Sequence, residues 1–243
     1  MRGFAPWLRL LALGFLAVAL LAPETFAPLL RPLAGNNASP IYTQTSLALL
    51  TLRHLELVAI AISAAFVVAA GFAMVVTRRF GAEFLPLSRS LVNIGQTFPP
   101  VAVLALAVPA VGFGAVPTVI ALFLYALLPI FENTTAGLRG VAPAVVEAAR
   151  GVGLTPLQRL WQVELPLALP LMIAGLRLSV VVSLGTATIG STVGAPTLGE
   201  VIIAGLLSNN LAFVVQGATI VGLLAILSFD ALTLLERRFS HPK

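Results

Sequence analysis

The sequence predicts an all-α integral membrane protein with about six transmembrane helices. Of its 243 residues, 59% are hydrophobic and only 9% are charged, and the mean hydropathy is +1.04. A water-soluble globular protein of this size could not cover its surface with so few charged groups. Apolar segments long enough to cross a bilayer lie at residues 7–23, 53–76, 90–111, 115–131, 171–194 and 211–235.

The distribution of basic residues predicts the orientation in the membrane. Six spans place both termini on one side, together with the connections at 77–89 and 132–170. That side and its membrane edge hold twelve of the fourteen basic residues, whereas only Arg31 and Arg53 fall opposite. By the positive-inside rule, both termini and the 132–170 connection are cytoplasmic, in a multi-pass protein of the inner (plasma) membrane. The formal charge of +5 therefore reflects topology, and no nucleic-acid partner is expected because the basic residues are scattered.

The N-terminal region has two interpretations. Residues 1–22 have the basic start and apolar stretch of a secretory signal peptide, whose cleavage would leave five spans. A retained anchor helix is favoured, because Pro23-Glu24-Thr25 follows without a small-x-small cleavage site. Residues 31–52 contain several Asn, Ser and Thr residues and are predicted to form an external loop along the membrane interface.

Prolines inside the apolar segments predict kinks. Pro99, Pro100, Pro109 and Pro129 each remove a backbone donor that only neighbouring helices or water can replace. Kinked helices of this kind pack within a bundle.

Small residues recur at every fourth position in the fifth apolar segment, a spacing that lets two helix backbones approach closely. They are Gly175, Ser179, Ser183, Ala187 and Ser191. Tight helix packing is the favoured interpretation for each one. Neighbouring threonines nevertheless indicate a wet path along the upper half of this helix, and the residues predicted to line a solute path are Ser183, Thr186, Thr188, Ser191 and Thr192.

A polar segment at 147–166, EAARGVGLTPLQRLWQVELP, predicts two short helices joined by a turn. Pro143 suits the first turn of the first helix, and Gly151 and Gly153 end that helix. Thr155 and Gln158 are spaced as a capping box for the second helix. That helix is amphipathic and too short to cross a bilayer, so it suits docking into another protein. Its apolar face comprises Leu157, Leu160, Trp161 and Leu165.

The same segment is identified by its spacing: EAA, three residues, Gly153, nine residues, Val163, one residue, then Leu165-Pro166. It resembles the EAA loop of ABC-importer permeases, which lies in the cytoplasm and inserts into a cleft of the ATPase subunit. An ordinary interfacial hairpin is the alternative, and the full spacing disfavours it. The resemblance implies a type I importer architecture with a coupling loop at about 135–170. The implied ATPase contacts are Glu147, Ala148, Ala149, Gly153, Leu157, Leu160, Trp161, Leu165 and Pro166.

A wider resemblance covers about residues 50–238. The runs at 124–138, 163–177 and 185–206 are similar to permeases of osmoprotectant importers, which take up glycine betaine, choline or carnitine. The resemblance implies a homodimer or a heterodimer with a sister permease, an ATPase subunit under each permease, and a separate extracytoplasmic solute-binding protein. We therefore expect one transmembrane domain, 1–243. Its residues 1–52 form an anchor helix and an external loop, and residues 53–243 form the permease core. Glu132 departs from the family pattern, which often has a basic residue there.

Several residue types are too rare to support other chemistry. The only lysine is Lys243, so the chain has no Walker A motif, and ATP hydrolysis belongs to another polypeptide. No enzyme activity and no cofactor are expected, since ATP is bound by the partner subunit. The chain has no cysteine, and no metal site is predicted.

Three rival functions remain open at this point. An ABC permease for an amino acid or a sulfonate would share the same coupling loop. An ion-coupled secondary carrier would use Asp230 as its coupling carboxylate, although a structural pairing or a water-exposed position is favoured, since Arg237 follows on the same helical face. An intramembrane enzyme is disfavoured, because His54 is the only histidine near the membrane and no G-x-S-x-G run is present. For His54 and Glu56, at the external start of the second span, snorkelling or mutual pairing is expected, and Glu132 is expected to brace the coupling loop.

Overall fold

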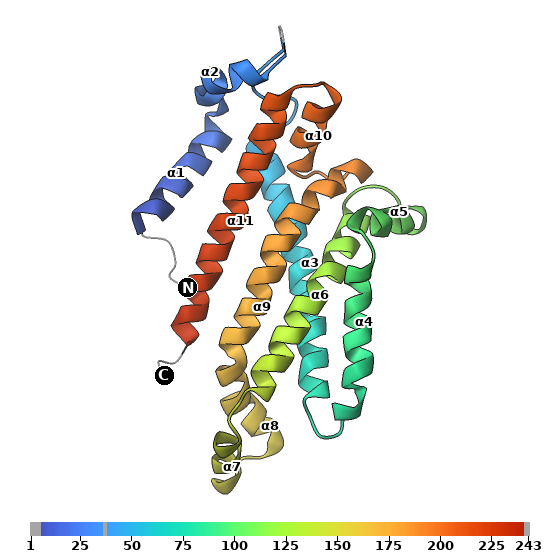
Figure 1. The fold of residues 1–243 in the computed structure, drawn as a ribbon, viewed down its shortest axis with the longest axis vertical. Helices are drawn as coiled ribbons and strands as arrows, with labels where there is room; N and C mark the ends of the chain where they lie inside the picture. The colour runs from blue at the N-terminus through green and yellow to red at the C-terminus, as the bar shows by residue number, and fades with distance from the viewer. Residues whose placement is uncertain (1–5, 36–37, 241–243) are drawn as a thin grey trace.

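The computed structural model describes residues 6–35 and 38–240, and within these ranges every regular element is a helix. Four long helices lie side by side as the main bundle (Figure 1). They are α3 (Leu47–Val76), α6 (Ala115–Arg139), α9 (Leu165–Thr186) and α11 (Leu211–Phe239). The predicted all-α membrane class is confirmed.

The number of spans depends on two bent helix pairs. Continuous helices at Leu47–Val76, Ala115–Arg139, Pro156–Val193 and Leu211–Phe239 are long and apolar enough to cross a membrane. The pair Pro6–Leu21 and Pro23–Leu33 is bent by 105°, and the pair Ala82–Thr97 and Pro100–Val111 by 93°. Counting each bent pair as one span gives six, the expected number.

The third apolar segment, 90–111, does not form the expected continuous span. It is divided between α4 (Leu85–Thr97) and α5 (Pro100–Val111), and α5 projects sideways from the bundle (Figure 1). Phe98 is extended, with φ −93° and ψ 138°, because the residue before a proline avoids the helical region. The break confirms the kink expected at Pro99 and Pro100. Pro109 and Pro129 lie inside α5 and α6, and those helices continue past them.

The region expected to be an external loop at 31–52 is shorter and more buried than predicted. Short helical turns η1 (Pro23–Phe26), α2 (Ala27–Leu30) and η2 (Arg31–Leu33) follow α1 (Pro6–Leu21). α3 begins at Leu47, where Ser46 caps the helix by accepting a hydrogen bond from the Leu49 amide. Ile41 and Tyr42 are only 1% and 2% exposed, so the loop packs on the bundle and does not lie along the interface.

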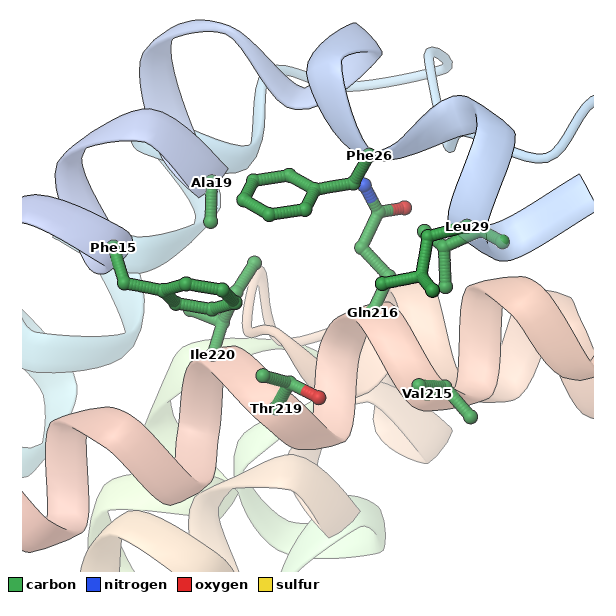
Figure 2. A pocket seen from close by; sticks show the side chains of 9 residues that line it. Phe15, Ala19, Phe26, Leu29, Val215, Gln216, Thr219 and Ile220 are labelled. Atoms are coloured by element: carbon green, nitrogen blue, oxygen red, sulfur yellow. The ribbon is translucent and has the colours of Figure 1, made fainter. Parts of the chain in front are cut away.

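α1 lies beside α11 (Figure 1) and contacts it at two places. Arg9 forms an ion pair with Asp230 at 2.5 Å. Farther along α1, Figure 2 shows Phe15 and Phe26 facing α11 across a small cavity. The cavity is lined mainly by apolar side chains, and Gln216 and Thr219 supply its polar atoms.

The contact between α6 and α9 is much closer. A Cβ atom at Gly175 would lie 2.7 Å from the Pro129 carbonyl oxygen and 2.7 Å from the Asn133 Cβ. The Ser179 hydroxyl donates to the Ala126 carbonyl at 3.1 Å. Tight packing, the favoured interpretation of the small residues in α9, is therefore confirmed for these two positions.

The remaining elements gather at the two ends of the bundle (Figure 1). The α7 end comprises α7 (Pro143–Gly151), α8 (Pro156–Arg159), the π-helical turn η4 (Leu160–Glu164) and the turn that follows α3. The α10 end comprises α2, the loop at 38–46, α5, η5 (Ala187–Val193) and α10 (Gly199–Leu207). The last turns of α11 point toward the α7 end.

The second helix of the polar segment is not the separate short helix that was predicted. α8, η4, α9 and η5 form one rod from Pro156 to Val193, 38 residues long. Pro166 has no amide hydrogen to donate within the rod. The π-turn just before it shifts the hydrogen-bond register, with the Leu165 amide donating to the Leu160 carbonyl, so that the helix continues past the proline.

Candidate functional site

The predicted coupling segment forms a hairpin at the tip of the α7 end (Figure 1). Pro143 is the first residue of α7, as expected. Beyond the helix end, the Gly153 amide donates to the Arg150 carbonyl at 2.9 Å and the Leu154 amide to the Ala149 carbonyl at 3.2 Å. These two bonds form a Schellman motif, with Gly153 at φ +85°. A Cβ at Gly153 would meet nothing within 4 Å, so it is the left-handed backbone that favours glycine there.

The start of α8 has the predicted capping box. The Thr155 hydroxyl accepts from the Gln158 amide at 3.3 Å, and the Gln158 side-chain oxygen accepts from the Thr155 amide at 2.9 Å. Both ends of the turn between α7 and α8 are thus fixed by local hydrogen bonds.

The expected single apolar face of this helix is divided in two. Leu157 and Trp161 are 65% and 60% exposed, one helical turn apart. Leu160 is buried in a cluster with Ala70, Leu138, Ala168 and Met172, against which Leu165 also packs. Leu160 and Leu165 therefore attach the segment to its own bundle, and Leu157 and Trp161 face outward.

The other predicted ATPase contacts are mostly exposed. Glu147, Ala148, Gly153 and Pro166 lie at the surface, whereas Ala149 is buried. Glu147 forms an exposed ion pair with Arg150 at 2.7 Å. Val152, which sequence reasoning did not single out, is 78% exposed at the turn. We define the docking surface as Glu147, Ala148, Val152, Gly153, Leu157 and Trp161.

A buried carboxylate just behind the docking surface was missed at the sequence level. The Glu164 side chain is 6% exposed and accepts from Arg78 at 2.5 Å and from Arg159 at 2.8 Å. Arg78 follows α3, so the pair joins segments far apart in the sequence. Arg159 precedes Glu164 by five residues, a spacing that faces the same side only in a π-turn. The side-chain spacing of a regular α-helix therefore predicts neither the contact of Glu164 with Arg78 nor the contact with Arg159.

Other ionisable groups have different partners from those expected. Glu132 forms two short bonds with Arg89 of α4, at 2.5 and 2.8 Å, and so braces α4 against α6 instead of the coupling loop. Glu56 pairs with Arg53 at 2.9 Å, not with His54.

His54 is completely buried, and its ring nitrogens form hydrogen bonds with the Leu184 carbonyl and the Leu198 amide. Asp230 is buried and forms an ion pair with Arg9 of α1, so it is structurally paired and not water-exposed, and this partner is not the Arg237 from which the pairing was argued. Among the described residues, no cluster of His, Cys, Asp or Glu could hold a metal ion.

The residues predicted to line a solute path lie together where α9 passes into η5, at the α10 end. Ser183 is only 1% exposed, and its hydroxyl has no hydrogen-bond partner within the described chain. The Thr188 and Thr192 hydroxyls donate to the Gly185 and Ile189 carbonyls, each at 2.7 Å. The Ser191 hydroxyl is 2.7 Å from that of Thr197, and Thr186 is half-buried. Their role in a solute path stays a prediction.

Comparison with known proteins agrees with this architecture. Residues 68–241 match the family described as "Binding-protein-dependent transport system inner membrane component". The chain is 40% identical over 197 residues to the osmoprotectant import permease protein OsmY of Salmonella typhimurium, covering 81% of this chain and 84% of the relative. It is 38% identical over 191 residues to the choline transport system permease protein OpuBB of Bacillus subtilis, covering 78% and 87%.

Solved structures share the fold. An inward-facing structure of the MetNI methionine ABC transporter superposes with a TM-score of 0.71 at 23% identity, covering 78% of this chain and 94% of the other. The crystal structure of an amino acid ABC transporter with histidines gives a TM-score of 0.65 at 20% identity, covering 90% and 98%. The chain therefore belongs to the family of binding-protein-dependent inner membrane components and is a permease subunit of an ABC importer.

Proposed function

We propose that this permease imports quaternary-amine osmoprotectants such as glycine betaine, choline or carnitine. The names of the relatives support this solute class, since they include osmoprotectant, choline and carnitine permeases at 37–40% identity over about four fifths of the chain. The methionine and amino acid transporters share the fold at 20–23% identity, which supports no solute assignment. An amino acid or a sulfonate remains the rival substrate.

In this proposal, the ATPase subunit that drives transport contacts the permease at the docking surface. The observation that carries it is the exposure of Leu157 and Trp161 on a hairpin whose two ends are fixed by hydrogen bonds. Large apolar side chains exposed beside charged groups at the tip of a bundle are typical of a protein contact. A separate ATPase subunit would cover them and hydrolyse ATP, so this chain needs no cofactor of its own.

The orientation is part of the same proposal. Basic residues at the α7 end include Arg78, Arg139, Arg150, Arg159 and Arg238, whereas Arg31 and Arg53 lie toward the α10 end. The asymmetry supports a cytoplasmic α7 end with both termini on that side. The external α10 end would then receive solute from a separate binding protein, and a second permease, a copy or a sister chain, would complete the path along the shared interface. In the same proposal, the boundary between the anchor region and the permease core lies at the start of α3 and not between residues 52 and 53. The anchor with its loop then covers 1–46, and the core begins at Leu47.

The test is ATP-driven uptake by the complete complex in proteoliposomes. Glycine betaine, choline and carnitine are compared with methionine and taurine, each with and without ATP. We expect uptake of a quaternary amine that requires ATP. Preferred uptake of methionine or taurine would contradict the solute class, and uptake driven by an ion gradient without ATP would favour the secondary carrier.

The docking surface is tested in the same complex with Trp161→Asp. A buried charge in the contact should lower co-purification of the ATPase and uptake at least about tenfold, while the permease stays in the membrane. Phe113→Asp is the matched control, because Phe113 is 78% exposed but lies at the turn between α5 and α6. An intact, fully active complex with Trp161→Asp would show that this surface does not bind the ATPase.

A further inference from the structure

The hairpin of the docking surface has few attachments to the rest of the chain. α7 packs mainly on α8 and η4, so its position depends on how η4 is held. η4 is a π-helical turn, in which the hydrogen-bond register of the rod changes. Such turns are less regular than α-helix and often occur at functional positions. A rigid transmission of movement through this point requires a second connection.

Glu164, the last residue of η4, supplies that connection. One carboxylate oxygen accepts from Arg159 of α8 and the other from Arg78 beyond the end of α3. The Arg159 and Arg78 side chains are only 13% and 18% exposed, so water screens these bonds little. One side chain thereby joins the hairpin, the long rod and α3.

The burial of these charges is informative about their role. Removing a carboxylate and a guanidinium from water costs free energy that the ion pair does not fully regain, and well-packed apolar residues often stabilise a protein as much or more. A buried charged cluster does, however, restrict geometry, because each partner must remain in place to satisfy the others. At this position the restricted geometry is that of the docking surface relative to α3.

We propose that Glu164 is a positioning residue for energy coupling: it clamps the α7–α8 hairpin to α3, so that a displacement of the ATPase moves the spans as a rigid body. The inference rests on the proposed docking role of the hairpin. Without the clamp, the π-turn would bend first. ATP would still be hydrolysed, and less of the movement would reach the spans.

Spin-label distances in the complete complex test the clamp directly. The chain has no cysteine, so nitroxides can be attached specifically at Val145→Cys on α7, outside the docking surface, and at Phe80→Cys beyond α3; the two parent residues are 39% and 76% exposed. The parent protein should give a narrow distance distribution between these labels. Glu164→Gln should widen it, and so should Arg159→Gln, which leaves the bond between Arg78 and Glu164 intact and guards against a failure of Glu164→Gln to fold.

A second label pair controls for general loosening. Phe113→Cys and Leu207→Cys lie at the α10 end and are 78% and 85% exposed in the parent chain. Their distance distribution should be unchanged by either substitution. Widening of both pairs would show that the effect is global and would overturn a local positioning role.

The functional measurement is the amount of solute imported per ATP hydrolysed. In both variants this ratio should fall about tenfold, within the range of known coupling free energies, while the ATPase still co-purifies. Glu164→Asp, which keeps the charge, should recover part of the loss. An unchanged ratio and an unchanged label distribution in Arg159→Gln and Glu164→Gln would overturn the clamp. If Trp161→Asp also left the complex intact, the docking function itself would be wrong.

Discussion

At the two ends of the bundle, different chemical groups make the contacts between segments that lie far apart in the sequence. At the α7 end, the buried contacts join full charges, as in Glu164 with Arg78 and Arg159. At the α10 end, the loop at 38–46 is held by hydrogen bonds without an ion pair: the Tyr42 amide donates to Gln216 at 3.0 Å, Asn210 donates to the Ser39 carbonyl at 2.8 Å, and the Glu200 carboxylate accepts from the neutral hydroxyls of Tyr42 and Thr45.

His54 shows the pattern of the α10 end most clearly. Its Nδ1 accepts from the Leu198 amide at 3.3 Å, so its Nε2 carries the proton and donates to the Leu184 carbonyl at 3.0 Å. The side chain joins α3 to the end of α9 and to the start of α10. Both partners are backbone groups, next to the turn where α9 gives way to the narrower helix η5.

The difference matters for movement. The energy of an ion pair falls slowly with distance, whereas a hydrogen bond weakens steeply once its length or angle changes. The ion pairs of the α7 end therefore keep the hairpin attached to α3 while that end moves as a unit, and the hydrogen bonds of the α10 end keep one local geometry.

The largest expected effect is at His54. His54→Leu removes one hydrogen bond of the Leu184 carbonyl and the acceptor of the buried Leu198 amide, at about 1–3 kcal/mol for a buried group left unsatisfied. The melting temperature of the purified protein in detergent should fall clearly. His54→Gln carries both a donor and an acceptor and should recover much of the loss. Equal melting temperatures for the Leu variant and the parent would show that these bonds do not hold the α10 end.

A smaller effect is expected from the Tyr42 hydroxyl, which donates to Glu200 at 2.6 Å. Burial, and then the hydrogen bond to Glu200, raise the pKa of Tyr42 to about 12. Because the folded pKa lies above the usual value of about 10, the stabilisation is complete below pH 10 and is lost as pH rises toward 12. Tyr42→Phe should cost about 1–2 kcal/mol at neutral pH and should remove a late step from the ultraviolet titration of the tyrosines. A Tyr42 step near pH 10 would contradict the buried contact.

The backbone at Gly153 is expected to contribute about 1 kcal/mol. Gly153→Ala fits the space but not φ +85°, so it should weaken the hairpin by roughly that amount and lower ATPase affinity several-fold. Gly153→Asn should be milder, because asparagine adopts the left-handed region more readily. Titration of the ATPase into labelled permease measures both. Equal affinities for the Ala and Asn variants would show that backbone strain is not the cause.

The smallest effect is expected at the exposed pair of Arg89 and Glu132. Their bonds are short, yet the side chains are 51% and 35% exposed. Exposed ion pairs contribute between zero and about 1 kcal/mol, and salt screens them. Arg89→Gln should change the melting temperature little, and less at high salt than at low salt. A loss as large as that of His54→Leu would contradict the distinction between buried and exposed contacts.

Local rules explain what the sequence could predict. The capping box at Thr155, the positive φ at Gly153 and the break at Pro99 each depend on a few adjacent residues. Composition and apolar length determine the all-helical membrane class in the same way.

The failures come from contacts between distant segments or from shifts of helix register. Nothing near Glu164 or Asp230 in the sequence indicates Arg78 or Arg9 as partners. The helix expected after Thr155 was too short to cross a bilayer, whereas it continues into the next span through a π-turn. The polar character of residues 38–46 predicted exposure, whereas their hydrogen bonds to α10 and α11 are made only when the bundle has formed.

The rod from Pro156 to Val193 also acts as a lever. At 1.5 Å per residue, its 38 residues span about 57 Å, nearly twice the ~30 Å hydrocarbon thickness of a bilayer. A pivot within the membrane turns a tilt of a few degrees into displacements of about 1–3 Å in opposite directions at its two tips. The side chains of Leu157 and Thr192 stand near those tips, so a pull at one and an opening at the other would be a single motion of one piece of chain.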